Sequence, residues 1–300
     1  MQQDPATMMR DFYYDLSDRG VLTVDGAVQD DPWFLDFFFR RLAPTANPEY
    51  PEYPYVCRCG DEMNYLRPAD TPVVYTGFDG SRLFYGYSLS TPFYPERLSH
   101  SQDGVLYHWS PIGERGRIVP HVATEIARHI EPWGPFYAYL GDNGRERVPL
   151  MPLHLSDSIE IIRPKRDNHC VGCGVANPFS LRLSFVRDVK DGVLHTWLRP
   201  DERMHGSMGT THGGFVSLLL DETMGKALSS VGIRAPTARL AVNFRRPMLL
   251  GEEYEVKSWI GSQQGRKKYV FGEIRATADS AHVVADAEAL FLEVKSPEGE

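Results

Sequence analysis

The sequence predicts an α+β protein of two domains, the second built around one long apolar helix flanked by strands. The two halves differ in composition: residues up to about 150 are rich in aromatic residues and proline, and the rest is more regular. Residues 213–228 carry an uninterrupted apolar helix pattern. Strand patterns surround that helix in the order β-β-α-β-β-β-β, and the short connections after the helix favour antiparallel neighbours.

Composition limits the function classes. The chain has 300 residues and a net charge of -8, which argues against general nucleic-acid binding. No apolar run is long enough to span a membrane, and the first residues lack the basic and apolar segments of a signal peptide. Four cysteines are too few for a disulfide scaffold in a chain of this length. We therefore expect a cytoplasmic protein with reduced thiols.

The first half contains two predicted helices and a hairpin. Asp31 and Pro32 are a good N-cap and first helical residue, and they open an apolar helix over 32–42 that we expect to lie mostly in the core. Strands over 72–77 and 83–88 flank Asp79-Gly80, a hairpin turn signal. A second helix over 120–130 has an apolar stripe.

The polar segment 141–147 separates the two halves. We therefore expect a small α+β domain over 1–150 and a second domain over 151–300. In the second domain, strand patterns cover 181–185, 192–198, 237–246, 253–260, 268–276 and 282–294.

Asp221 is a carboxylate within the apolar helix over 213–228. The residues three and four positions further on are Met224 and Gly225, so no cation shares its face, whereas Glu222 has Lys226 at the i,i+4 spacing. The pattern predicts that Asp221 is buried and unpaired and that Glu222 is solvated. A buried, unpaired acid is more often a working group than a structural one.

Gly213 and Gly214 begin the same helix, and His212 takes the cap position. Free backbone N–H groups at a helix start can polarise a ligand carbonyl, and the absence of Cβ atoms lets the ligand approach. Asp221 lies roughly 12 Å further along the helix at ~1.5 Å per residue, too far to act on a carbonyl held there. The spacing therefore predicts a site shared between two subunits. Asp221 is expected to act as a general base on a water or as the nucleophile, and Thr237 is a suitable hydroxyl to orient that water.

The second half resembles the PaaI-type acyl-CoA thioesterases of the hotdog fold, in which an antiparallel sheet wraps a long central helix. The resemblance covers about 166–294. The same segment is also similar to the thioesterase-superfamily members that act on long-chain acyl-CoA. The residues that carry it are Cys170-Val-Gly-Cys173-Gly-Val-Ala-Asn177-Pro178, Leu181-Arg-Leu183, His205 to Gly214, Leu219-Leu-Asp221-Glu222, Thr237 and Phe244-Arg-Arg-Pro247.

This resemblance implies hydrolysis of acyl-CoA to free acid and CoA, without a metal or cofactor, in a homodimer or tetramer. The catalytic roles fall on Asp221, Thr237 and the Gly213 amide, and we add His212. Many relatives carry Asn about six residues before the His-Gly-Gly sequence, whereas this chain has Gly206. The candidate substrate-binding residues are Gly214, His205, Gly206, Asn243, Arg245, Arg246 and Lys267.

The phosphates of CoA require cationic donors, and the candidates are Arg245, Arg246, Arg266, Lys267 and Lys268. The first half resembles an uncharacterised domain over roughly 10–140. This resemblance implies no activity. The residues that carry it are Phe12-Tyr-Tyr-Asp15, Phe34 to Pro44, Cys59-Gly60, Asn64-Tyr-Leu-Arg67 and Pro72 to Thr76.

Three alternatives stay open. The second domain can be a non-catalytic acyl-CoA-binding or regulatory module, or a hotdog enoyl-CoA hydratase in which His205 and Glu222 are the available pair. A zinc site made of both cysteine pairs, Cys57 with Cys59 and Cys170 with Cys173, is disfavoured by the Cys-x-Cys spacing and by the placement of the pairs in different domains.

Overall fold

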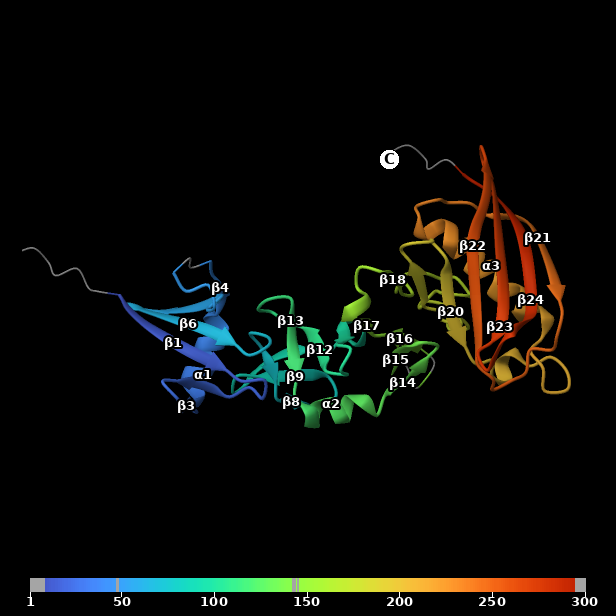
Figure 1. Ribbon diagram of the computed structural model, residues 1–300. Helices are drawn as coiled ribbons and strands as arrows, with labels where there is room; N and C mark the ends of the chain where they lie inside the picture. Colours follow the sequence, from blue (N-terminus) through green and yellow to red (C-terminus); the bar gives the residue numbers. More distant parts are fainter. Residues whose placement is uncertain (1–8, 47–48, 142–143, 145, 295–300) are drawn as a thin grey trace, which may run out of the picture. The chain divides into compact units, whose positions relative to one another are not determined.

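The structure is a computed structural model that describes residues 9–46, 49–141, 144 and 146–294. It divides into two compact units, Met1–His129 and Ile130–Glu300, coloured blue to green and green to red in Figure 1. The division falls ahead of the polar segment 141–147 where the sequence places it. Asp142, Asn143 and Arg145 of that segment lie outside the described residues.

The first unit begins with a six-stranded sheet in the order β3-β2-β1-β6-β5-β4, in which β1 and β6 are parallel. Its elements are β1 (Arg10–Leu16), β2 (Leu22–Val24), β3 (Ala27–Gln29), α1 (Pro32–Arg41), β4 (Ala43–Pro44), β5 (Tyr55–Cys59) and β6 (Glu62–Pro68).

The rest of the first unit consists of short strands and one helix. They are β7 (Val74–Tyr75), β8 (Gly77–Phe78), β9 (Arg82–Tyr85), β10 (Leu89–Pro92), β11 (Leu98–His100), β12 (Leu106–Trp109), β13 (Arg115–Ile118) and α2 (Pro120–Ala127), with a 3-10 turn, η1 (Pro95–Arg97).

Both predicted helices of this unit form. The Asp31 carboxylate accepts the Phe34 N–H at 2.7 Å and caps α1. Phe38 and Phe39 are buried, but Trp33 is 70% exposed, so only one face of α1 reaches the core. The β8–β9 hairpin turns where predicted. The strand predicted over 72–77 instead divides into β7 and β8, which belong to different sheets.

The second unit starts with a small sheet of β14 (Ile130–Trp133), β15 (Phe136–Gly141) and β16 (Glu146–Pro149). This sheet packs on β20 through Trp133, whose Nε1–H donates to the Trp197 carbonyl at 2.7 Å. The two indole rings meet edge to face, with centroids 5.1 Å apart. A Cβ on Gly134 would lie 2.4 Å from the Trp197 ring, so this turn requires glycine.

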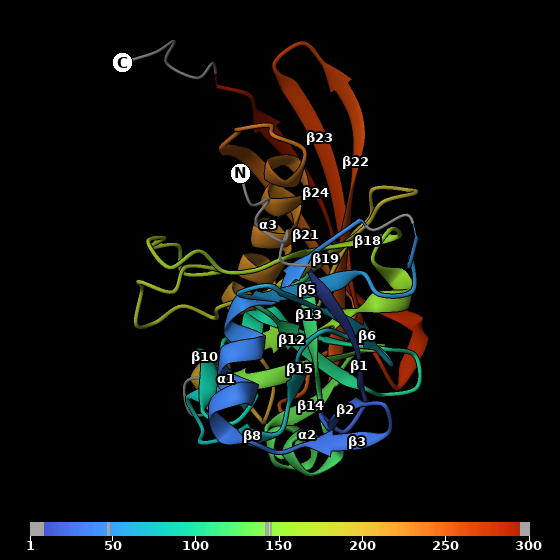
Figure 2. The same ribbon diagram turned by 90° about the vertical axis from the view of Figure 1, so that its left-hand side faces the viewer.

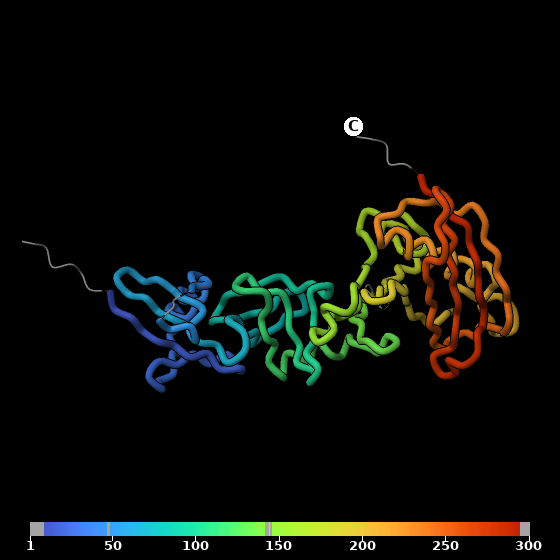
Figure 3. The backbone as a smooth tube through the Cα atoms, turned by 45° about the horizontal axis from the view of Figure 1, so that its top comes forward, coloured from blue at the N-terminus to red at the C-terminus, as the bar shows by residue number. Residues whose placement is uncertain are grey.

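The main sheet has seven strands in the order β18-β19-β20-β22-β23-β24-β21, and every neighbouring pair described is antiparallel. Figure 3 shows its long strands together at the red end of the chain. Its strands are β18 (Ile159–Ile162), β19 (Phe185–Asp188), β20 (Leu194–Leu198), β21 (Thr237–Phe244), β22 (Tyr254–Gln264), β23 (Lys267–Ala276) and β24 (Asp279–Leu292). The other elements of the unit are β17 (Met151–Pro152), the helix α3 (Gly213–Ser230) and two 3-10 turns, η3 (Leu153–Leu155) and η4 (Glu202–Met204).

Helix α3 lies along one face of this sheet (Figures 1 and 2). Its buried stripe contains Val216, Leu219, Leu220, Met224 and Leu228, which form the core together with strand residues. The predicted helix is confirmed. Its burial is one-sided in a single chain, however, because the sheet covers one face and leaves Gly214 exposed and Leu218 half-buried.

The strand predicted over 181–185 is wrong, because regular pairing begins only at Phe185. Arg182 has a φ of 51°, in the left-handed region that interrupts a strand. The N–H groups of Leu181 and Leu183 donate instead to the carbonyls of Val171 and Gly172. The segment therefore belongs to a loop that packs beside α3. Across the whole unit, α3 is the single α-helix that the described residues contain.

Candidate functional site

The first candidate element is the start of α3. His212 has extended backbone angles, and its Nδ1 accepts the Gly214 N–H at 2.9 Å, so it caps the helix as its position predicts. The N–H groups of Phe215 and Val216 donate to the His212 carbonyl. Within the described part of the chain, the Gly213 N–H has no acceptor. This group is therefore the donor that the helix start leaves available.

An open groove of about 410 Å³ lies at this helix start. Phe244, 59% exposed, forms part of its wall, and a Cβ on Gly213 would touch the Phe244 ring at 3.4 Å. The other lining residues are Thr210, Thr211, Val216, Arg245, Arg246, Pro247, Met248 and Val284. The groove combines an apolar wall, two arginines and a backbone donor.

Asp221 and Thr237 form the second candidate element. The Thr237 hydroxyl donates to Asp221 Oδ1 at 2.7 Å, which joins the middle of α3 to the first residue of β21. Asp221 is half-buried and Thr237 is exposed. The prediction of a buried Asp221 is therefore wrong, because the side chain is half-buried and its partner is the hydroxyl of Thr237. The carboxylate faces the side of α3 that the sheet of this chain does not cover.

Glu222, predicted to be solvated, is largely enclosed instead. Its side chain is 13% exposed, and Lys226 lies 3.9 Å away. Its Oε2 accepts from the Cys170 thiol at 3.1 Å. Sequence spacing identified the Lys226 partner, but only the fold brings the loop that contains Cys170 against this helix.

The two candidate elements lie at opposite ends of β21. In the β21–β24 pairing, Thr237 lies opposite Phe291 and Phe244 lies opposite Ala285. Asp221 accompanies the Thr237 end, and Gly213 accompanies the Phe244 end. One chain therefore does not bring Asp221 and Gly213 together, in agreement with the distance along the helix.

His205 and Gly206 lie in the loop before α3. His205 Nε2 accepts the Gly209 N–H at 3.3 Å, and Nδ1 lies 3.6 Å from Glu202. A Cβ on Gly206 would lie 2.9 Å from the His212 Cα, closer than real Cβ atoms approach. Glycine at 206 is thus required by the close approach of this loop to the cap of α3.

Asn243 and Arg245 meet Asp286, an acid that the sequence analysis missed. The Asn243 amide donates to Asp286 Oδ1 at 2.8 Å, and the Arg245 guanidinium forms an ion pair with the same carboxylate. The hydrogen bond from Arg245 lowers the pKa of Asp286 below its usual value. The alternation of polar and apolar residues in β24 is the sequence signal that places Asp286 on the Arg245 face.

The predicted basic cluster is divided between the two ends of the sheet. Arg245 and Arg246 lie at the Phe244 end of β21 and line the groove. Lys267 pairs with Leu292 at the other end, where Lys268 contacts Glu293 at 2.8 Å and the Arg266 side chain donates to the carbonyl of the same residue. Within one chain, Lys267 is therefore not a neighbour of Arg245.

Comparison with known proteins finds one family model that matches within each half of the chain. Residues 208–280 match the family model of the thioesterase superfamily, and residues 1–134 match a domain of unknown function (DUF4505). Both resemblances drawn from the sequence are thereby confirmed. Among curated proteins, the chain is 30% identical to acyl-coenzyme A thioesterase THEM4 from Xenopus laevis over 96 residues, 32% of this chain and 43% of the relative. The chain thus spans less than half of that relative's length.

Two solved structures are similar to part of the chain. A thioesterase superfamily protein is 28% identical with a TM-score of 0.37, and the match covers 41% of this chain and 63% of that protein. The E. coli PaaI protein from the phenylacetic acid degradation operon is 18% identical with a TM-score of 0.35, covering 38% and 80%. No helix among the described residues has the length and apolar character needed to cross a membrane.

Proposed function

We propose that the second unit is a hotdog-fold thioesterase that hydrolyses acyl-CoA to free acid and CoA. The observation that carries the proposal is the 2.7 Å hydrogen bond between Thr237 and Asp221, which fixes a carboxylate at the open side of α3. The thioesterase superfamily match over residues 208–280 and the similarity to a curated acyl-CoA thioesterase supply the reaction class.

In the proposed reaction, Asp221 acts as general base. A water bound beside the carboxylate transfers a proton to Asp221, and its oxygen attacks the thioester carbonyl carbon. The Gly213 N–H donates to the carbonyl oxygen as negative charge develops there. The carbon–sulfur bond then breaks, and the CoA thiolate takes the proton back from Asp221. Thr237 holds the carboxylate in position throughout.

The site is complete only if two copies of the chain combine. In the described sheet, β21 is an edge strand whose outer side has no neighbour. Antiparallel pairing of two β21 strands about a two-fold axis places the Phe244 end of one strand beside the Thr237 end of the other. Gly213 of one copy then approaches Asp221 of the second copy. We therefore propose a homodimer, which can associate further into a tetramer.

The same pairing gives the divided basic residues a common role. It brings Arg245 and Arg246 of one copy toward the end of the sheet that holds Lys267 of the other. Arg246 is exposed at the groove, and the contacts of the described residues include no ion pair for it, so it can bind a phosphate. Arg245 instead forms an ion pair with Asp286. We propose that this mixed surface binds the phosphates of CoA, with Asn243 and Asp286 fixing the Arg245 side chain.

The structure disfavours a hydratase. Such an enzyme requires a histidine beside an acid, and His205 with Glu222 was the available pair. His205 contacts Glu202 and Gly209, whereas Glu222 contacts Cys170 and Lys226. The two residues belong to separate networks, so they do not form a catalytic pair in this arrangement.

The first test measures CoA release from a panel of acyl-CoA esters with a thiol reagent. Asp221→Asn keeps the shape of the side chain but removes the base, and we expect kcat to fall about 100-fold or more. Acyl-CoA binding with an unchanged Kd in this variant separates catalysis from binding. A wild-type protein that binds acyl-CoA without turning it over supports the alternative of a binding module.

The second test concerns the Gly213 N–H. Proline is tolerated at the first position of a helix but has no N–H, so Gly213→Pro removes the proposed donor and preserves α3. Gly213→Ala retains the N–H and is the matched control. We expect Gly213→Pro to lose activity and Gly213→Ala to keep most of it. Equal activity of the two variants would exclude this role for the amide.

Mixing the two inactive variants tests the shared site. A heterodimer of Asp221→Asn and Gly213→Pro has one site with both changes and one intact site. Random mixing should therefore restore about a quarter of the wild-type activity, because about half of the dimers are mixed and each has one working site. A mixture that stays inactive, while both variants remain dimeric, contradicts a site built from two chains.

A further inference from the structure

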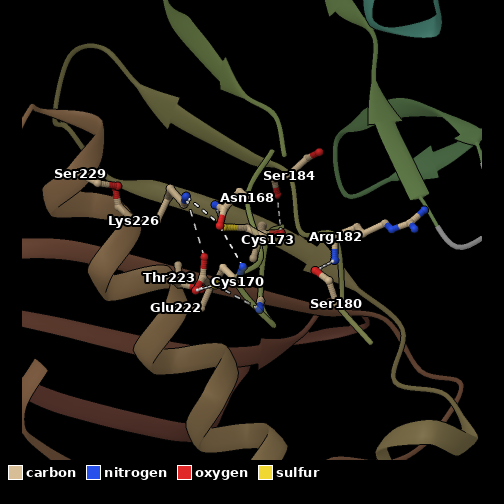
Figure 4. A network of polar contacts seen from close by, with 12 residues as sticks. Asn168, Cys170, Cys173, Ser180, Arg182, Ser184, Glu222, Thr223, Lys226 and Ser229 are labelled. Atoms are coloured by element: carbon tan, nitrogen blue, oxygen red, sulfur yellow. Dashed lines mark hydrogen bonds and ion pairs between the residues drawn. The ribbon is translucent and has the colours of Figure 1, made fainter. Parts of the chain in front are cut away.

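Two cysteines and an acid meet beside α3, outside the residues of the proposed reaction. The loop after β18 contains Cys170-Val-Gly-Cys173-Gly and packs against the helix. The sulfur atoms of Cys170 and Cys173 and a carboxylate oxygen of Glu222 all lie within 4.8 Å of one another. Figure 4 shows the two cysteine side chains facing Glu222 and Lys226. All four cysteines of the chain are free.

N–H donors point at both sulfur atoms. The Gly172 N–H donates to Cys170 Sγ at 3.3 Å, and Lys226 Nζ lies 3.2 Å from Cys173 Sγ. The Asn168 amide lies 3.8 Å from the same sulfur. Donors of this kind stabilise a thiolate, which is the form in which cysteine binds metal ions, and they orient metal-bound ligands.

Two glycines allow the loop to adopt this geometry. A Cβ on Gly172 would lie 2.5 Å from Glu222 Cγ and 2.7 Å from its Oε2, so only glycine lets the carboxylate reach the sulfurs. A Cβ on Gly174 would lie 2.2 Å from the Asn168 carbonyl oxygen. The Cys-x-Gly-Cys-Gly sequence is therefore matched to a tight turn that presents both sulfurs and one carboxylate to the same point.

The charges of the cluster accommodate one divalent cation. The Cys170 thiol donates to Glu222 Oε2, and Lys226 Nζ lies 3.9 Å from the Glu222 carboxylate. Glu222 and Lys226 then balance each other. Replacing the two thiol protons by one dication leaves the net charge of this half-buried cluster unchanged, which avoids an uncompensated charge beside the core.

We propose that Cys170, Cys173 and Glu222 bind one zinc ion. Two thiolates and one carboxylate match the ligand preferences of zinc, whereas magnesium and calcium prefer oxygen ligands alone. The fourth tetrahedral position is left to a water molecule. Lys226 and Asn168 act as outer partners that donate to Cys173.

The bound ion joins the loop to α3 one residue after Asp221. The ligands come from segments that are 52 residues apart in the chain, as for Cys170 and Glu222. The ion thus holds the loop against the helix that carries the proposed base. The zinc proposal does not depend on hydrolysis, because ion binding is measured directly.

The test uses the full chain, reduced and freed of metal with a chelator, and titrated with Co²⁺. We expect a thiolate-to-cobalt charge-transfer absorption that saturates at one ion per chain and disappears when Zn²⁺ is added. Cys170→Ser and Cys173→Ser should abolish the absorption. Cys59→Ser is the matched control in the other unit and should leave it intact. Unlike the buried Cys57, Cys59 is half-buried, so its replacement is mild.

Two further variants test the acid and its partner without removing a sulfur. Glu222→Gln should weaken cobalt and zinc binding more than Lys226→Met, for which we expect a loss of about 10-fold. Absence of the charge-transfer absorption in the reduced wild-type protein would overturn the proposal. So would finding that Cys170 and Cys173 form a disulfide and bind no ion after reduction. Loss of acyl-CoA hydrolysis with normal zinc binding would instead count only against the proposed function.

Discussion

The Asp221 side chain on α3 is held by one hydrogen bond from another element, β21. Its helix alone supplies no partner, and the hydroxyl that orients it belongs to the first residue of β21. Thr237 was identified from the sequence because it resembles the Ser/Thr of related thioesterases. The hydrogen bond follows from the packing of α3 on the edge of the sheet.

Replacing Thr237 tests this contact. Thr237→Val removes the hydroxyl and keeps the branched shape, and Thr237→Ser keeps the hydroxyl. We expect Thr237→Val to lower kcat about 10-fold, equivalent to roughly 1.4 kcal/mol of the activation barrier. Thr237→Ser should stay close to the wild type. If Thr237→Val keeps the wild-type kcat and Thr237→Ser loses activity, methyl packing rather than the hydrogen bond is what matters.

The pair of His195 and Glu255 predicts a pH dependence of stability. His195 Nδ1 lies 2.8 Å from Glu255, and the side chains are 24% and 26% exposed. The hydrogen bond from His195 lowers the pKa of Glu255. A lowered folded-state pKa stabilises the protein above the unfolded carboxyl pKa of about 4.3, and this contribution is lost as the pH falls through the folded value.

Glu255→Gln should therefore lower the free energy of unfolding by about 1 kcal/mol at neutral pH. This is less than the loss expected for a fully buried pair, because solvent screens the partly exposed charges. The difference from the wild type should shrink in acid. Urea unfolding at several pH values measures it. Glu160→Gln, which breaks a more exposed pair with Arg187, is the control and should show a smaller effect. A Glu255 difference that persists undiminished in acid contradicts this assignment.

At the scale of residues, the sequence identified the carboxylates but not their environments. Helical spacing correctly paired Glu222 with Lys226. It predicted one buried and one solvated acid, whereas both are half-buried, because burial is set by what packs against each face. Glu222 faces the Cys170 loop, and Asp221 faces the side that one chain leaves open.

Among the elements, the start of α3 depends on its preceding loop. The Gly206 N–H donates to the Thr210 carbonyl at 2.7 Å, and the His212 N–H donates to the Met204 carbonyl at 2.8 Å. These bonds hold the loop so close to the helix cap that residue 206 has no room for a side chain. Glycine at this position therefore follows from the local backbone of this chain.

Introducing that Asn should accordingly harm the protein. We expect Gly206→Asn and Gly206→Ala to destabilise the fold by about 1–3 kcal/mol, the usual cost of overpacking. Thermal unfolding measures the loss. Ser207→Ala, at an exposed neighbouring position, is the control and should be neutral. A Gly206→Asn variant that is stable and more active would show that the loop can adopt the arrangement of the relatives.

Elements with strong local patterns were predicted well. The ends of α3, β21, β22 and β23 lie within a few residues of the predicted ones, because apolar periodicity and turns mark them. The strand predicted over 181–185 failed for a tertiary reason. Its apolar residues are indeed buried at Leu183 and Phe185, but the N–H groups of Leu181 and Leu183 donate to the cysteine loop rather than to a strand.

For the whole chain, the division between units at residues 129 and 130 predicts which fragment of the second unit is the more stable. Residues 130–150 include the β14–β16 sheet, and Trp133 is 2% exposed against Trp197. A fragment of residues 130–300 keeps this contact, and a fragment of residues 151–300 loses it. We expect the shorter fragment to be less stable by about 3 kcal/mol or more, the usual loss for a buried tryptophan.

Chemical unfolding of the two fragments measures this difference. Trp133→Ala in the longer fragment is the matched comparison, because it removes the same indole while keeping the rest of the sheet. We expect Trp133→Ala to account for much of the stability that the shorter fragment loses. Equal stability of the two fragments would place the start of the folded unit near residue 151 instead.

The sequence by itself predicted α3 and the strands that follow it, the superfamily resemblance, and the separation of Asp221 from Gly213 on which the proposed two-chain site rests. These follow from residue patterns at fixed spacing and from the rise of a helix, which are local properties. The tertiary structure decided that Glu222 is enclosed, why residue 206 is glycine, and that two cysteines meet Glu222. Each of these depends on packing between separate segments, and no local pattern encodes the distance between side chains that lie 52 residues apart.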